Sequence, residues 1–150
     1  MVVIKNGNLL DCTEDIIIHQ VNCEGVMGGG VARQLALQYP DLEEIYKRHC
    51  DLTCNNYNKL KGTIFTVTTA DVEKEYKTIC NIFSQESNFN TDYEALKKCL
   101  EKVKKYAKYH CKSIAIPYKI GCGIANGDWD IVLDIILEVF GDYDITLYKI

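Results

Sequence analysis

The sequence has no long apolar run, no excess of basic residues and no proline- or serine-rich stretch. A helix that spans a bilayer needs about 20 consecutive, mostly apolar residues, and the longest apolar run, around Ile16–Ile18, is far shorter. General binding to nucleic-acid phosphates needs a basic surface, whereas this chain has a net charge of −4. We therefore expect no membrane insertion and no bulk binding to nucleic acid.

The N-terminal stretch also lacks the basic start and apolar segment of a secretion signal, so we expect a cytoplasmic protein. Among the eight cysteines, Cys80 lies in a strand-like run and Cys99 in a helical pattern. These positions favour reduced thiols over a disulfide framework. His49, Cys50 and Cys54 have no second Cys/His pair at the spacing of a zinc site, so no metal is expected.

No linker, repeat or low-complexity stretch divides the chain, which predicts a single domain over residues 1–150. Strand-like and helix-like stretches alternate with short connections, a pattern typical of an α/β sandwich around a largely parallel sheet. The predicted strands are 2–6, 15–22, 62–70, 76–83, 112–117 and 144–150, and the predicted helices are 29–38, 40–50, 90–110 and 127–141.

Capping motifs predict where two helices begin. Thr91 followed by Glu94 has the spacing of a capping box. Asp128 in the sequence Asn-Gly-Asp-Trp has the chemistry of an N-cap or first-turn carboxylate. We therefore expect the helix after residue 90 to begin at Thr91, and we expect Asp128 to stabilise the last helix.

Two glycine-rich loops follow predicted strands. QVNCEGVMGGGVARQLALQYP, residues 20–40, holds four of the ten glycines, and YKIGCGIANGDW spans residues 118–129. Ligands of open α/β sheets bind beyond the carboxyl ends of the strands, and helix N-termini carry unpaired N–H groups. A tight turn explains one or two glycines but not the run Gly28–Gly30. The two loops therefore predict a phosphate cradle made of main-chain N–H groups rather than Lys or Arg.

Other nucleotide-binding signatures do not fit the sequence. G-x-x-x-x-G-K-[ST] does not occur, and the first glycine loop is not G-x-G-x-x-G with an acidic residue about 20 positions later. A P-loop and a dinucleotide-binding fingerprint are therefore not expected.

Over its whole length, the chain resembles a macrodomain, most closely the fungal ADP-ribose 1''-phosphate phosphatase type and its phage and bacterial relatives. This resemblance implies a three-layer α/β/α sandwich around a mixed, largely parallel six-stranded sheet. It implies ADP-ribose or an ADP-ribose derivative as ligand, free or attached to a macromolecule, and no cofactor. The resemblance rests on the stretches 7–10, 16–40, 81–85, 91–100, 116–132 and 144–150.

The resemblance also implies hydrolysis of an ADP-ribose derivative, with ADP-ribose 1''-phosphate phosphatase activity favoured. Two alternatives stay open: a non-catalytic reader, and an ADP-ribosyl hydrolase acting on protein, nucleic acid or O-acetyl-ADP-ribose. Hydrolases of glutamate-linked ADP-ribose use a lysine near the end of the fourth strand and an acid in the last glycine loop. This chain has Ser84, Gln85 and Ala125 there, which counts against that mechanism.

Residue roles follow from the resemblance. His19 becomes a candidate nucleophile or acid/base, against the alternative of a buried strand histidine; strand alternation would place it on the opposite face from Asn22. Asn22 would hold the distal ribose, and Asp128 would orient water if it is not a helix cap. Asn8 and Leu9 would border adenine. The other ligand-binding residues implied are Gly28, Gly29, Gly30, Val31, Phe83, Ser84, Gln85, Gly121, Cys122, Gly123, Ile124 and Ala125.

Overall fold

The computed structural model describes residues 1–86 and 90–150. Its strands are β1 (Val2–Asn6), β2 (Ile16–Val21), β3 (Ile64–Ala70), β4 (Tyr76–Phe83), β5 (Ile114–Pro117) and β6 (Ile145–Lys149). They form one six-stranded sheet in the order β1-β6-β5-β2-β4-β3. Neighbours are parallel except β3 and β4, which pair antiparallel. The predicted mixed, largely parallel sheet is therefore confirmed.

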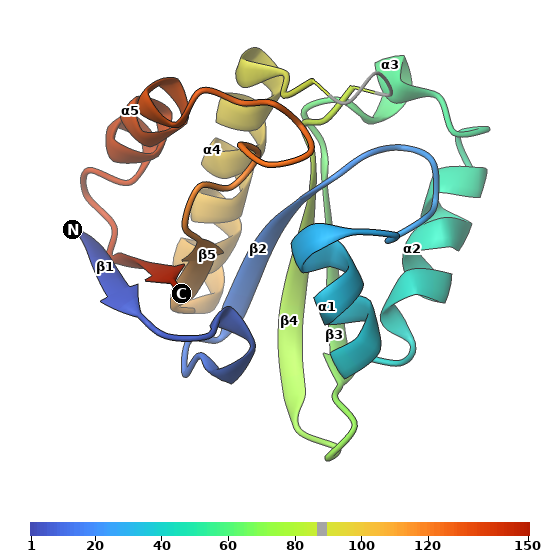
Figure 1. Cartoon of the computed structure of the whole chain (residues 1–150), viewed down its shortest axis with the longest axis horizontal. Helices are drawn as coiled ribbons and strands as arrows, with labels where there is room; N and C mark the ends of the chain where they lie inside the picture. Colours follow the sequence, from blue (N-terminus) through green and yellow to red (C-terminus); the bar gives the residue numbers. More distant parts are fainter. Residues whose placement is uncertain (87–89) are drawn as a thin grey trace.

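Helices cover both faces of this sheet (Figure 1). They are α1 (Gly30–Gln38), α2 (Leu42–Asp51), α3 (Tyr57–Leu60), α4 (Tyr93–His110) and α5 (Trp129–Val139), with a 3₁₀ turn η1 at Leu9–Asp11. α4 and α5 lie on one face, and α1 and α2 on the other (Figure 1). The short elements α3 and η1 were not predicted, because four or three residues are too few to show a helical period.

The run of isoleucines in β2 follows from its central place in the sheet. Side chains alternate along a strand, so a strand with helices on both sides is apolar at successive positions. Ile16 and Ile18 are buried in the cluster that includes α4 and α5 residues. Ile17 and Val21 are buried in the cluster that includes α1 and α2 residues. The two clusters form the hydrophobic core on either side of the sheet.

The predicted cap of α4 is wrong, and that of α5 is confirmed. Asp92, rather than Thr91, is the N-cap of α4, and its Oδ1 accepts a hydrogen bond from the Ala95 N–H at 3.0 Å. Thr91 instead donates its hydroxyl to the Gly121 carbonyl at 2.7 Å. Asp128 caps α5 through Oδ1, which accepts from the Asp130 N–H at 2.9 Å.

All eight cysteine thiols are free, and all lie within the described residues. Cys54 and Cys111 are exposed, Cys122 is half-buried, and the others are buried. This agrees with the expectation of reduced thiols. Among the helices of residues 1–86 and 90–150, none combines the length and apolar character needed to cross a membrane.

Candidate functional site

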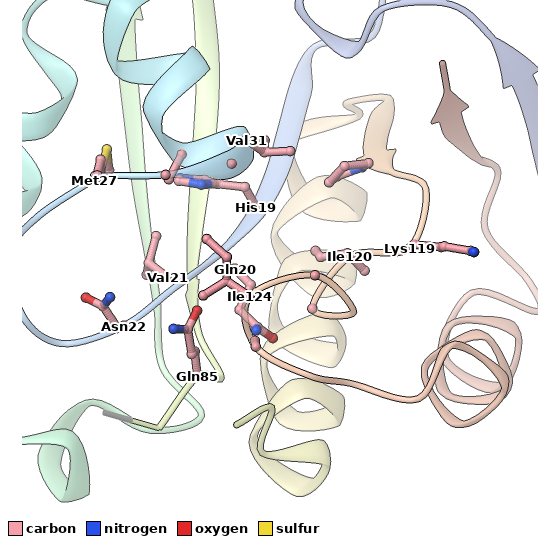
Figure 2. Close-up of a pocket in the computed structure, with 18 of the residues that line it drawn as sticks. His19, Gln20, Val21, Asn22, Met27, Val31, Gln85, Lys119, Ile120 and Ile124 are labelled. Atoms are coloured by element: carbon pink, nitrogen blue, oxygen red, sulfur yellow. The ribbon is translucent and has the colours of Figure 1, made fainter. Parts of the chain in front are cut away.

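A cavity of about 480 Å³ lies between the loop that follows β2 and the loop that follows β5 (Figure 2). Because β2 and β5 are adjacent and parallel, their carboxyl ends open at the same edge of the sheet. The cavity therefore occupies the position at which open α/β sheets bind ligands. The predicted site residues that line it are His19, Asn22, Gly28, Gly29, Gly30, Val31, Gln85, Gly121, Gly123, Ile124 and Ala125.

The remaining predicted site residues do not line this cavity. Leu9, Phe83 and Ser84 are buried, and Cys122 directs its thiol to the Ile120 carbonyl at 3.4 Å. Two others are held by helix ends, since Asn8 Oδ1 accepts from the Leu10 N–H at 3.0 Å and Asp128 caps α5. The ligand contacts predicted for these residues stay predictions.

Several lining residues were not predicted, and they flank the glycine loops or the strand ends. Glu24 is the one acidic side chain and Lys119 the one Lys or Arg on the wall formed by the described residues. Lys119 extends away from the other labelled side chains in Figure 2. Positive side-chain charge therefore contributes little inside the cavity, and an anion there depends on main-chain dipoles. The unpredicted wall residues also include Gln20, Val26, Met27 and Ile120.

The first array of main-chain donors lies where α1 begins. Gly29 is the N-cap and makes no side-chain capping bond, and the earliest bond of the helix runs from the Arg33 N–H to the Gly29 carbonyl at 3.2 Å. Within the described structure, the N–H groups of 28–32 have no hydrogen-bond partner. Gly30 has a φ of +57°, in the left-handed region that favours glycine. This end of α1 can therefore accept an anion.

The second array lies in the loop between β5 and α5. Gly121, Gly123, Ile124 and Ala125 all line the cavity, and their N–H groups have no partner among residues 1–86 and 90–150. Each of these groups can donate to an oxygen of a bound ligand. Two unpaired donor arrays thus border one cavity, which suits a ligand with several anionic oxygens.

The two loops approach each other across the cavity. A Cβ placed on Gly29 would lie 3.1 Å from Cδ1 of Ile124, whereas a Cβ on Gly28 or Gly30 would meet nothing within 4 Å. Figure 2 shows Ile124 projecting from the second loop toward the space in front of the first. Ile124 therefore forms a partial bridge over the cavity, and the glycines opposite it leave room for a ligand.

His19 is held as a neutral imidazole. It is buried, and its Nε2 lies 2.6 Å from Oδ1 of Asn81. The Asn81 amide donates Nδ2–H to the Phe65 carbonyl at 3.0 Å, so the oxygen of that amide faces His19. Nε2 must then carry the proton and donate it, which leaves a lone pair on Nδ1. Nδ1 has no partner within the described residues, although His19 belongs to the cavity wall.

Burial lowers the pKa of His19 to about 4, although the Asn81 hydrogen bond opposes this shift. An unfolded histidine binds a proton near pH 6.5, whereas the folded protein does so only near pH 4. The unfolded state therefore binds more protons between these values, and stability falls as the pH is lowered from 6.5 towards 4.

We expect the titration of His19 to lower the free energy of unfolding by about 2 kcal/mol when the pH falls from 7.5 to 5. Urea unfolding at the two pH values measures this, with His19→Gln as the variant that removes the titration. His110→Gln, which alters an exposed histidine outside the cavity wall, is the control. An unchanged pH dependence in His19→Gln would contradict the assignment.

Asn22 is oriented by the loop that contains it. Its Oδ1 accepts from the Glu24 N–H at 2.9 Å and lies 3.0 Å from the Tyr46 hydroxyl. Since the oxygen is the accepting atom, the Nδ2 amide is left as a donor, and no partner for it exists among the described residues. Because β2 ends at Val21, the alternation of side chains along the strand does not determine the direction of Asn22. Asn22 therefore lines the same cavity as His19. Asn22 can donate to a hydroxyl or phosphate oxygen there.

Two enzymes are similar in sequence to most of this chain. The DNA ADP-ribosyl glycohydrolase of Mycobacterium tuberculosis is 25% identical over 99% of the chain, which spans 42% of that protein. The ADP-ribose 1''-phosphate phosphatase of Saccharomyces cerevisiae is 28% identical over 90% of the chain and 89% of its own length. The chain thus spans less than half of the first relative and most of the second.

Solved structures share the fold. The macrodomain of Mycobacterium tuberculosis DarG superposes with a TM-score of 0.84 at 24% identity, over 100% of this chain and 98% of that one. Thermosipho africanus DarTG in complex with ADP-ribose gives a TM-score of 0.78 at 19% identity, over 97% of this chain and 41% of that one. The Macro domain family matches residues 18–136. With this match over most of its length, the chain belongs to the Macro domain family.

Proposed function

We propose that this protein binds ADP-ribose in the cavity between the β2 and β5 loops. The observation that carries the proposal is a pair of N–H arrays on the wall of one cavity, at 28–32 and at Gly121, Gly123, Ile124 and Ala125, that have no partner among the described residues. A pyrophosphate has several anionic oxygens that accept from such donors without Lys or Arg. A cavity of 480 Å³ falls in the range of small-molecule sites. The ADP-ribose complex of the similar Thermosipho africanus structure supports the choice of ligand.

The reaction we propose is hydrolysis of ADP-ribose 1''-phosphate. Water attacks the terminal phosphorus, the bond from phosphorus to the ribose oxygen breaks, and ADP-ribose and inorganic phosphate are released. A neutral imidazole with a free lone pair can accept the proton that the attacking water gives up, and the released ribose oxygen is protonated in turn. The Nδ1 of His19 has that lone pair, and the yeast phosphatase is similar to this chain over most of its length.

A non-catalytic ADP-ribose reader is the second candidate, and a specific observation favours it. Asp128 is engaged in capping α5 and does not line the cavity. The Ser84 hydroxyl is likewise committed, since it donates to Gln20 Oε1 at 2.7 Å. Glu24 is then the one carboxylate on the described cavity wall, so few groups are available for acid–base chemistry.

Phosphate release from ADP-ribose 1''-phosphate distinguishes the two candidates. We expect the wild-type protein to release phosphate and His19→Gln to be slower by roughly 100-fold, the lower range of general acid–base contributions. Glutamine keeps a polar side chain of similar length, and His49→Gln is the control for an effect of histidine loss elsewhere.

Calorimetry with ADP-ribose accompanies the assay. If the wild type bound ADP-ribose without releasing phosphate, the proposed phosphatase activity would be contradicted and the role of a non-catalytic ADP-ribose reader would remain. Release that is equal in wild type and His19→Gln would contradict the role of His19. Absence of binding heat for the wild type would contradict the proposed ligand itself.

A further inference from the structure

A chain of side-chain hydrogen bonds connects three segments beside the cavity. The Ser84 hydroxyl, after β4, donates to Gln20 Oε1 of β2 at 2.7 Å. Gln20 Nε2 donates to Thr91 Oγ1 at 3.2 Å. Thr91 Oγ1 donates to the carbonyl of Gly121 at 2.7 Å. This series of hydrogen bonds therefore ends on the backbone of the loop that presents the second donor array.

The direction of every bond in this chain is fixed by its last acceptor. A carbonyl oxygen only accepts, so the Thr91 hydroxyl must give its proton to Gly121. The Thr91 oxygen then accepts from the Gln20 amide, and this places the Gln20 oxygen where it accepts from Ser84. No member can reverse its role without breaking a bond, and Ser84 is fully buried. Such a network is rigid because each group has a single satisfied arrangement.

The same residues hold the loop by its main chain. The Thr91 N–H donates to the Ala125 carbonyl at 2.8 Å, and the Gly127 N–H donates to the Gly121 carbonyl at 2.8 Å. The two carbonyls at the ends of the 121–125 segment are thus both bound. With these carbonyls turned into the protein, the N–H groups of Gly123, Ile124 and Ala125 have no partner within the described structure and belong to cavity-wall residues, whereas the Cys122 N–H donates to the Lys119 carbonyl at 3.0 Å.

We propose that Ser84, Gln20 and Thr91 are positioning residues that set the main-chain geometry of the 121–125 loop for a diphosphate. This inference rests on the proposed function, because it concerns how that site is pre-organised. Donors that are already oriented cost no reorganisation when the ligand binds. The effect of the network should therefore appear in affinity for the diphosphate and not for a ligand that lacks it.

Thr91→Val tests the proposal, because valine keeps the shape of threonine and removes the hydroxyl. We expect the Kd for ADP-ribose, measured by calorimetry, to rise by roughly 10- to 30-fold. Thr91→Ser restores the hydroxyl and should bind within about threefold of wild type, and adenosine, followed by NMR titration, should bind equally to all three proteins. Ser84→Ala, at the other end of the hydrogen-bond series, should also weaken the binding of ADP-ribose.

The outcomes separate this inference from the proposed function. Wild-type binding together with unchanged affinity in both Thr91→Val and Ser84→Ala would overturn the positioning role and leave ADP-ribose binding intact. An equal loss for adenosine and ADP-ribose would also overturn it, since this would indicate general damage to the fold. A wild type that binds no ADP-ribose would instead refute the proposed function.

Discussion

Replacing Gly127 with alanine is expected to remove measurable ADP-ribose binding, a loss of more than roughly 100-fold, and to lower the unfolding free energy by about 2–4 kcal/mol. A Cβ at this position would lie 2.4 Å from the carbonyl oxygen and 3.1 Å from the carbonyl carbon of Gly121. Both are main-chain atoms, so the loop itself must move. That movement breaks the Gly127–Gly121 hydrogen bond of 2.8 Å and displaces the second donor array.

Calorimetry with ADP-ribose and urea unfolding measure the two effects of Gly127→Ala. Gly141→Ala is the matched control, because its Cβ would come no closer than 3.4 Å to the Leu137 carbonyl and the residue lies outside the cavity. The control should bind normally and change stability by no more than about 0.5 kcal/mol. Normal binding by Gly127→Ala would show that the loop tolerates movement and is not a pre-formed anion site.

Introducing glutamate at Gly29 is expected to abolish ADP-ribose binding, by more than roughly 1,000-fold, without unfolding the protein. Gly29 caps α1 with φ −156° and ψ 167°, an extended conformation that any residue adopts. The new carboxylate would sit beside the unpaired N–H groups of 28–32 and compete with the ligand for them. Its side chain would also enter the space opposite Ile124.

The thermal stability of Gly29→Glu separates this explanation from misfolding. A carboxylate near a helix N-terminus contributes about 0.3–1 kcal/mol, so the melting temperature should stay close to that of wild type. Gly29→Ala is the control, because its Cβ meets the flexible end of Ile124 at 3.1 Å, and it should lose little affinity. If Gly29→Glu bound ADP-ribose with the affinity of the wild type, the anion would have to bind elsewhere on the protein.

Most of the fold could be predicted because its signals are local and periodic. The isoleucines of β2 show a buried strand directly. The buried apolar positions of α4, which include Leu96, Leu100, Val103 and Ala107, show a helical period, and each pattern is long enough to be read from the sequence alone. α3 and η1 are shorter than one clear period, so they were missed. The cap of α4 was assigned one residue early because Thr91 and Asp92 both have capping chemistry, and only tertiary structure shows that Thr91 binds Gly121 instead.

The site was predictable to the extent that it is made of main chain. The glycine run at 28–30 and the glycines Gly121 and Gly123 indicated close backbone approach, and these residues line the cavity. The roles of the side chains at the site were harder to predict from the sequence. The tautomer of His19 depends on Asn81, which lies 62 positions away in the sequence. The role of Gln20 similarly depends on partners in two other segments, and no local pattern marks such pairings.

The most direct test of the account is an amide-resolved NMR titration of the ¹⁵N-labelled wild-type protein with ADP-ribose at constant ionic strength. The account predicts that the largest shifts fall on the amides of 28–32 and of Gly121, Gly123, Ile124 and Ala125, the groups that lack partners in the described structure. Saturation with ADP-ribose that leaves both sets of amides unmoved, or that shifts amides elsewhere on the molecule, would contradict it.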